Sequence, residues 1–214
     1  MTLSREENAM LERLRKPKYN PVKGFHESLF KLHNTRLIAD SQYLSIDYKL
    51  NLSAKELDFC MRIFRDNMTQ LYRSSSWGLN LIQKRQELQD NNARYLLVTT
   101  NNQVIGFCHF RFDVDDDYNP SAAVLYVFEL QILSRYRNYG IGSRLMEIIH
   151  LIAEKARMRK VMLTVFLENE AAMSFYKRLG YATDRISPSM YSEDTDYEIM
   201  SKCTYYEMDS DCIL

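Results

Sequence analysis

One carboxylate stands out because of its place in the sequence. Glu129 is the only charged residue in the apolar run from Val124 to Ile132, which is rich in β-branched, aromatic and aliphatic side chains. Such a run is typical of a strand that is buried on both faces. An ionised carboxylate is costly to bury. Glu129 is therefore either held by hydrogen bonds in the fold or kept for acid–base chemistry.

The residues that follow this run form a candidate anion site. Gly140 and Gly142 precede an amphipathic stretch from Ser143 to Ile149 that predicts a helix. At the start of a helix the backbone N–H groups lack partners and the helix dipole is positive, so phosphate can bind there, and glycine lets it approach closely. The alternative is that the two glycines only form a turn before an ordinary helix. The glycine-rich Lys-Ser/Thr loop of nucleotide triphosphate sites is absent.

Hydrophobic periodicity and capping signals predict the elements that must position these residues. Ser53 to Glu56 reads as a capping box, Asn101-Asn102 as a tight turn, and the only tryptophan, Trp77, falls in a loop at 73–78. We expect helices at 53–72, 80–94, from 143 onward and from 169 to 179, and strands at 44–52, 95–100, 103–112, 124–132, 160–166 and 197–202.

Composition places limits on the class of protein. With 214 residues, the chain is long enough for one core, and we expect a helical, basic segment at 1–20 and a single domain at 21–214. Basic and acidic residues both number 28, so we expect neither nucleic acid nor a membrane as partner. The four cysteines form no C-x-x-C pair, which predicts neither a metal site nor a disulfide framework. We see no signal peptide and no membrane-spanning run.

Two motifs in order carry a family resemblance. The run from Arg137 to Gly142 reads R-x-x-G-x-G directly after an apolar strand, and the run from Asn169 to Tyr181 reads N-x-x-A followed by FY-x-x-L-G-Y. Together they resemble the GNAT superfamily of N-acetyltransferases. The resemblance implies an α/β (α+β) GNAT fold: a mixed, mostly antiparallel central sheet flanked by helices. Its parallel strands at 124–132 and 160–166 would splay apart to admit acetyl-coenzyme A.

The same resemblance implies the chemistry. A neutral amine would attack the thioester directly, with Glu129 as general base and Tyr176 as the group that protonates the departing thiolate, although Tyr176 could equally serve helix packing. Asp113 is a second acid to consider. No metal is expected. The residues implied to bind acetyl-coenzyme A are Leu130, Gln131, Ile132, Arg137, Asn138, Tyr139, Gly140, Ile141, Gly142, Asn169 and Tyr176.

A narrower resemblance is to the NatD-type N-terminal acetyltransferases, which acetylate the N-terminal serine of histone four and histone two-A. It is carried by Leu71-Tyr72, Trp77-Gly78, HFRFD at 109–113, LYVFELQ at 125–131, KVMLTVF at 160–166, SPSM at 187–190 and YEIMS at 197–201. It implies a peptide pocket lined by Tyr72, Trp77, Asp113, Tyr126, Phe128, Glu129, Thr164 and Tyr197. Two departures are Phe128, where that family usually has tyrosine, and the long acidic loop at 113–119.

From this resemblance we expect an enzyme that acts as a monomer, without an auxiliary subunit, on histone tails of the Ser-Gly-Arg-Gly type, in nucleus and cytoplasm. Two alternatives remain. The chain could acetylate other protein N-termini or small amines, or it could be an acyl-coenzyme A-binding interaction module that has lost catalysis. The intact Glu129 disfavours the module.

Overall fold

The computed structural model describes residues 3–16, 19–32, 44–116, 122–192 and 194–204. The chain divides into two compact units, which are described one at a time. Unit 1 comprises Met1–Pro21, Arg111–Phe128 and Ile149–Leu214, and unit 2 comprises Val22–Phe110 and Glu129–Ile148. The predicted division into a segment at 1–20 and a domain at 21–214 stays a prediction.

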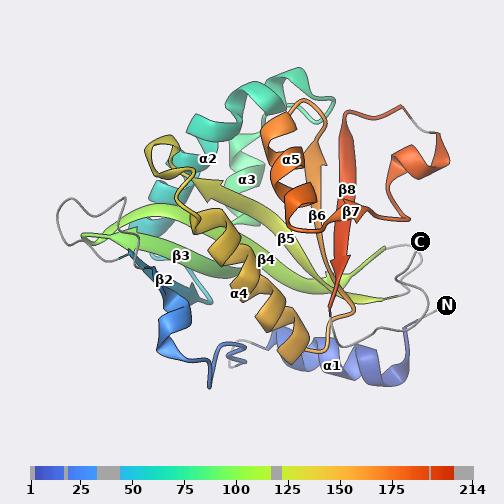
Figure 1. The fold of residues 1–214 in the computed structure, drawn as a ribbon, viewed down its shortest axis with the longest axis horizontal. Helices are drawn as coiled ribbons and strands as arrows, with labels where there is room; N and C mark the ends of the chain where they lie inside the picture. Colours follow the sequence, from blue (N-terminus) through green and yellow to red (C-terminus); the bar gives the residue numbers. More distant parts are fainter. Residues whose placement is uncertain (1–2, 17–18, 33–43, 117–121, 193, 205–214) are drawn as a thin grey trace. The chain divides into compact units, whose positions relative to one another are not determined.

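Unit 2 is built from antiparallel strands and two consecutive helices, with β2, β3 and β4 side by side (Figure 1). Its elements are η1 (Glu27–Phe30), β1 (Lys31–Leu32), β2 (Leu44–Lys49), α2 (Ala54–Ser74), α3 (Leu81–Glu87), β3 (Arg94–Thr100) and η2 (Ser134–Tyr136). Three elements run through both units: β4 (Gln103–Val114), β5 (Ala123–Ile132) and α4 (Ile141–Lys155).

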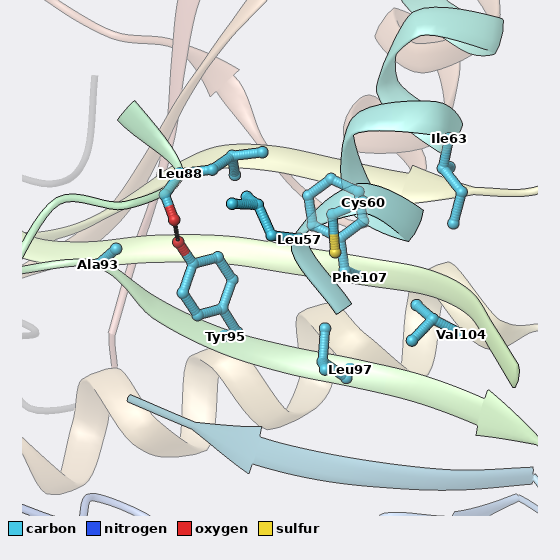
Figure 2. Close-up of a cluster of buried hydrophobic side chains, with 9 residues drawn as sticks. All are labelled: Leu57, Cys60, Ile63, Leu88, Ala93, Tyr95, Leu97, Val104 and Phe107. Atoms are coloured by element: carbon cyan, nitrogen blue, oxygen red, sulfur yellow. Dashed lines mark hydrogen bonds between the residues drawn. The ribbon is translucent and has the colours of Figure 1, made fainter. Parts of the chain in front are cut away.

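The core of unit 2 lies between α2 and the β3–β4 pair. Leu57, Cys60 and Ile63 recur on one stripe of α2 and meet inward-facing side chains of the two strands, as Figure 2 shows. The Tyr95 hydroxyl donates a hydrogen bond to the carbonyl of Leu88, the C-cap residue of α3. This bond satisfies the polar end of a buried ring, so the packing of α2 and the end of α3 are both fixed against the sheet.

Local signals explain where these elements begin. The Ser53 hydroxyl accepts from the N–H of Glu56, whose carboxylate accepts from the N–H of Ser53 at 2.7 Å, so the predicted capping box starts α2. Asn101 and Asn102 both adopt positive φ, 47° and 59°, and close the predicted turn between β3 and β4. A pair of positive φ values matches the twist of an antiparallel hairpin.

Unit 1 contains α1 (Arg5–Arg15), the end of β4, the start of β5, and the C-terminal elements. These are β6 (Lys160–Phe166), α5 (Glu170–Arg178), β7 (Ala182–Thr183), η3 (Pro188–Tyr191) and β8 (Tyr197–Cys203). β8 pairs antiparallel with both β6 and β7, and α5 lies beside β6 (Figure 1). Leu11 and Leu14 are buried on α1, as the helical pattern at 1–20 predicts.

β5 and β6 are parallel. Their register pairs Val124 with Lys160 and ends at Val127 with Leu163, although both strands continue. The described strands follow the order β1-β2-β3-β4-β5-β6-β8-β7, and the other pairings with a defined register are antiparallel. The predicted mixed, mostly antiparallel sheet with one parallel pair is therefore confirmed.

Some expectations are wrong in detail. The helix predicted at 80–94 ends at Glu87, and Arg94 already begins β3, because the Tyr95 bond to Leu88 and the buried strand residues override a polar, helix-compatible sequence. α2 continues to Ser74 rather than ending at Tyr72. Cys203 is disulfide-bonded, which the lack of a paired-cysteine motif did not predict. Residues 117–119 of the acidic loop lie outside the described residues.

Candidate functional site

Glu129 is the centre of a buried polar cluster in unit 2. Its side chain is 4% exposed, and both of its oxygens accept hydrogen bonds. Oε1 accepts from Nζ of Lys84 at 2.8 Å, and Oε2 accepts from Nε2 of Gln131 at 2.8 Å. Burial of the carboxylate is thus compensated by one charge and one amide. Of the two roles that the sequence left open for Glu129, hydrogen bonding in the fold is present, and it leaves further lone pairs on each oxygen.

Lys84 lies between two carboxylates. Its Nζ also donates to Oε1 of Glu87 at 2.7 Å, and its side chain is only 9% exposed. Burial by itself would lower the pKa of Lys84, but the carboxylates of Glu129 and Glu87 outweigh burial and raise that pKa above its ordinary value. The two carboxylates therefore favour the charged form of Lys84.

Gln131 is held in turn by α2. Its Oε1 accepts from Nδ2 of Asn67 at 2.9 Å, and the same Nδ2 reaches the carbonyl of Ile132 at 3.1 Å. Because the amide orientation of Gln131 is set by these contacts, its Nε2 points at Glu129. The backbone at Gln131 approaches β4 closely: a Cβ added at Gly106 would lie 2.9 Å from the Gln131 carbonyl oxygen.

Aromatic rings stand beside the cluster, as the narrower resemblance implies. Tyr72 contacts Phe64 and Trp77 edge to face, with centroids 5.3 and 6.3 Å apart, and Nζ of Lys84 lies 5.8 Å from the Tyr72 centroid. Burial, together with the charge of Glu129, raises the pKa of Tyr72 to about 12. Trp77 is 49% exposed. Unit 2 therefore brings together Tyr72, Trp77, Glu129 and Gln131 among the predicted site residues.

The predicted anion loop also lies in unit 2. Arg137 and Asn138 are exposed, Asn138 and Gly140 have φ of 64° and 79°, and α4 begins at Ile141. Nε of Arg137 donates to the carbonyl of Ile132 at 3.1 Å, which ties the loop back to the end of β5. The Gly140 carbonyl accepts from the N–H of Arg144. The helix N-terminus thus follows the glycine turn as predicted, with Tyr139 and Gly142 half-buried and Ile141 buried.

Unit 1 holds a second set of predicted residues. Tyr126 and Thr164, on neighbouring strands, join their hydroxyls in a hydrogen bond, and the Tyr126 and Phe128 centroids are 5.1 Å apart. Burial raises the pKa of Tyr126 to about 12, while Thr164 works against this rise and the charges of Tyr197, Asp184 and Asp113 add to it. The Arg111 guanidinium lies 4.4 Å from the Phe128 ring centroid. That phenylalanine, which departs from the family pattern, faces a cation.

Three predicted residues of unit 1 have contacts within the fold. Asp113 accepts from Nη2 of Arg15 at 2.7 Å and from the N–H of Val114 at 3.1 Å. Asn169 caps α5 by accepting from the N–H of Ala172 at 3.2 Å. Tyr176 is buried and packs edge-on against Phe175 and Tyr181, which is the packing role that the sequence left open for it. None of these contacts tests the predicted roles.

Lys84 is the residue of this cluster that sequence reasoning missed. It falls in a polar stretch in which a lysine looks like part of a solvated face, and its partner Glu129 is 45 positions away. The only sequence signal was indirect, namely that a buried carboxylate requires a counterpart.

Among the residues that the structure describes, no group of three or more His, Cys, Asp and Glu side chains could hold a metal ion. No helix in the described ranges is both long and apolar enough to cross a membrane.

Comparison with known proteins points to one family. The model of the acetyltransferase (GNAT) family matches residues 57–181. N-alpha-acetyltransferase 40 of Saccharomyces cerevisiae is 28% identical over 169 residues, which cover 67% of this chain and 58% of that protein. N-alpha-acetyltransferase 30 of Schizosaccharomyces pombe is 32% identical over 71 residues, 33% of this chain and 47% of that protein. The chain thus spans about half the length of these curated relatives.

Solved structures share the fold at low sequence identity. The Arabidopsis thaliana NAA60 crystal structure, in complex with a bisubstrate analogue, matches with a TM-score of 0.58 and 15% identity, over 76% of this chain and 100% of that one. The PaiA N-acetyltransferase of Thermoplasma acidophilum, in complex with coenzyme A, matches with a TM-score of 0.55 and 17% identity, over 74% and 99%. These likenesses establish the fold.

Proposed function

The chain belongs to the acetyltransferase (GNAT) family, whose model matches more than half of it, and from this premise we propose that it is an N-alpha-acetyltransferase. It would move an acetyl group from acetyl-coenzyme A to the N-terminal amine of a protein. The similarity to two N-alpha-acetyltransferases supports this choice among family activities. The loop from Arg137 to Gly142, at the start of α4, would bind the pyrophosphate of the co-substrate.

The observation that carries the proposal is the ionic environment of Glu129. Its carboxylate lies in β5, eight residues before Arg137, where that loop begins, and is held by a lysine ammonium at 2.8 Å. An ionised carboxylate can accept a proton from an amine, directly or through water. The amine nitrogen would bond to the thioester carbonyl carbon, the carbon–sulfur bond would break, the amine proton would pass to Glu129, and the thiolate would take up a proton. Tyr176 remains the proposed donor of that last proton.

The type of amine follows from basicity. An α-amino group has a pKa of about 7.7–8.0 and is partly neutral near pH 7, whereas lysine, near 10.4, is neutral in about one molecule in a thousand. A single carboxylate base can therefore deprotonate an N-terminal amine more readily than a lysine side chain.

For the substrate, we propose the N-terminal serine of histone four and histone two-A, on tails of the Ser-Gly-Arg-Gly type. Support comes from the NatD-type stretches of the sequence and from the similarity to N-alpha-acetyltransferase 40. In unit 2 the Tyr72–Trp77 pair offers aromatic surface beside a carboxylate, and in unit 1 Tyr126 and Thr164 offer hydroxyls. The aromatic pair suits a short N-terminus with small side chains. We also propose that the protein acts as a monomer, in the nucleus and the cytoplasm.

The test is acetylation of peptides that begin Ser-Gly-Arg-Gly, Met-Asp-Glu-Leu and Ala-Pro-Lys, measured as coenzyme A release. Native protein, Glu129→Gln and Glu12→Gln are compared, since Glu12 is an exposed glutamate on α1 and serves as a matched control. We expect turnover of the first peptide, a loss of about 10²–10⁴-fold in kcat in Glu129→Gln, and none in Glu12→Gln. Equal turnover of all three peptides would refute the histone preference. Absence of turnover with acetyl-coenzyme A still bound would favour the interaction module.

A further inference from the structure

We infer that Lys84 is a positioning residue that fixes Glu129 in the orientation and charge state required of the base, an inference that rests on the proposed function. Lys84 does not need to touch substrate for this role. It acts through the Glu129 carboxylate, to which it donates at 2.8 Å.

Burying the Lys84 ammonium costs free energy, which its contacts in the fold must offset. It is the buried member of α3, whose other basic residue, Arg85, is exposed and pairs with Asp58 at 2.9 Å. Removing an ammonium from water is costly, and a paired carboxylate together with further contacts can offset that cost. Those contacts are Oε1 of Glu87 at 2.7 Å and the face of the Phe64 ring, whose centroid is 5.0 Å from Nζ.

Geometry fixes the orientation of the Glu129 side chain. One oxygen is bound by Lys84 and the other by Gln131, which is itself bound by Asn67. A side chain anchored at both oxygens keeps one rotamer, and each oxygen retains a lone pair that can accept a proton from an amine or a water. The base is thus held in place before substrate arrives, which is a condition for efficient proton transfer.

The Lys84 ammonium places a positive charge directly beside the Glu129 carboxylate. The titratable groups around the pair are Tyr72 on α2, Lys84 and Glu87 on α3, and Cys108 and His109 on β4. Lys84 is the member of this set that carries a positive charge within hydrogen-bond distance of Glu129. Replacing Lys84 with methionine would leave the buried Glu129 carboxylate near Glu87 with no cation at hydrogen-bond distance. Burial and a neighbouring negative charge both favour the neutral form of a carboxyl group.

The test is the pH dependence of kcat/KM for the Ser-Gly-Arg-Gly peptide in native protein, Lys84→Met and Arg85→Met. We expect the acidic limb to move upward by about 1–3 pH units in Lys84→Met, because an opposite charge within about 4–6 Å shifts a carboxyl by that amount. KM for acetyl-coenzyme A should stay unchanged. Arg85→Met removes the same charge from the same helix and should leave the limb where it is. An unmoved limb in Lys84→Met overturns the inference while the proposed function stands.

Two additions keep the test decisive. If Lys84→Met does not fold, Lys84→Gln, which keeps an N–H donor but no charge, must show the same upward shift, and a native profile in it overturns the inference. If native protein acetylates no peptide, the proposed function fails by itself. The Lys84–Glu129 coupling is then measured by carbon-13 NMR titration of the Glu129 carboxyl. Protonation at higher pH in the lysine variant, and not in Arg85→Met, supports the coupling, and identical titrations refute it.

Discussion

Nη2 of Arg15 donates to Oδ1 of Asp113 across 2.7 Å, and Nε of the same guanidinium donates to the Phe112 carbonyl at 3.0 Å. One arginine near the end of α1 thus holds two consecutive residues of β4. Asp113, which the family resemblance assigns to the peptide pocket, therefore has a partner inside unit 1. Any role of this carboxylate toward a basic substrate side chain must be shared with Arg15.

We expect Arg15→Ala to lower the free energy of unfolding by about 1 kcal/mol, since a partly exposed, charge-assisted pair contributes about that much. It should also change KM for a peptide with arginine in third position more than KM for acetyl-coenzyme A. Urea unfolding and steady-state kinetics check both, with Arg13→Ala, an exposed arginine of the same helix, as control. Equal effects of the two substitutions would contradict this account.

Gly106 of β4 is expected to tolerate no side chain. A Cβ there would meet the Gln131 carbonyl oxygen at 2.9 Å and Cγ1 of Ile132 at 3.2 Å. Gly106→Ala must displace β5 backbone next to the residue that binds Glu129, so we predict a loss of about 1–3 kcal/mol in stability and a fall in kcat. Thermal unfolding and turnover are the measurements, with Gln103→Ala at the start of the same strand as control. A stable, fully active Gly106→Ala protein would show that β5 can move freely here.

The buried side chain of His150 should make the stability of the fold sensitive to acid. Burial, with a smaller effect of Lys202, lowers the pKa of His150 to about 4, and its Nε2 lies 2.9 Å from the Tyr181 hydroxyl. In the unfolded chain His150 takes up a proton near pH 6.5, whereas in the folded protein it does so only near pH 4. The stability contributed by neutral His150 is therefore fully present above about pH 6.5 and is lost as the pH falls toward 4. We expect a contribution of about 2 kcal/mol to the loss between pH 7 and 5.

Urea unfolding at pH 7 and pH 5 measures this contribution. His150→Gln should lose less stability between the two pH values than native protein does, whereas His26→Gln, which changes an exposed histidine, should behave like native protein. If His150→Gln shows the full native loss, another group is responsible for the acid sensitivity.

The Tyr126–Thr164 hydrogen bond predicts an energetic coupling between β5 and β6. In a double-mutant cycle of Tyr126→Phe and Thr164→Val, we expect a coupling of about 1 kcal/mol in stability, because each single change leaves a polar partner in a mostly buried site. Denaturant unfolding of the four proteins gives this value. Strict additivity would mean that the two hydroxyls contribute independently.

Several features were readable from the sequence because their causes lie within a few residues. The Ser53–Glu56 capping box, the Asn101-Asn102 turn, the Asn169 cap and the glycine turn before α4 are local interactions of side chain or backbone with nearby N–H groups. The apolar runs at 124–132 and 160–166 likewise indicated buried strands, and the two family motifs lie on these local features.

The partners of buried charges were not readable, because they come from distant parts of the chain. The apolar surroundings of Glu129 in the sequence indicated that this carboxylate needs a partner. The residues around Lys84 did not indicate that this lysine is buried, and the two residues are 45 positions apart. Arg15 and Asp113 are 98 apart. Such pairs form when helix packing brings side chains together and removes them from water. The sequence thus indicated a buried carboxylate at Glu129 that requires compensation, whereas the packing of α3 beside β5 determined which cation holds it.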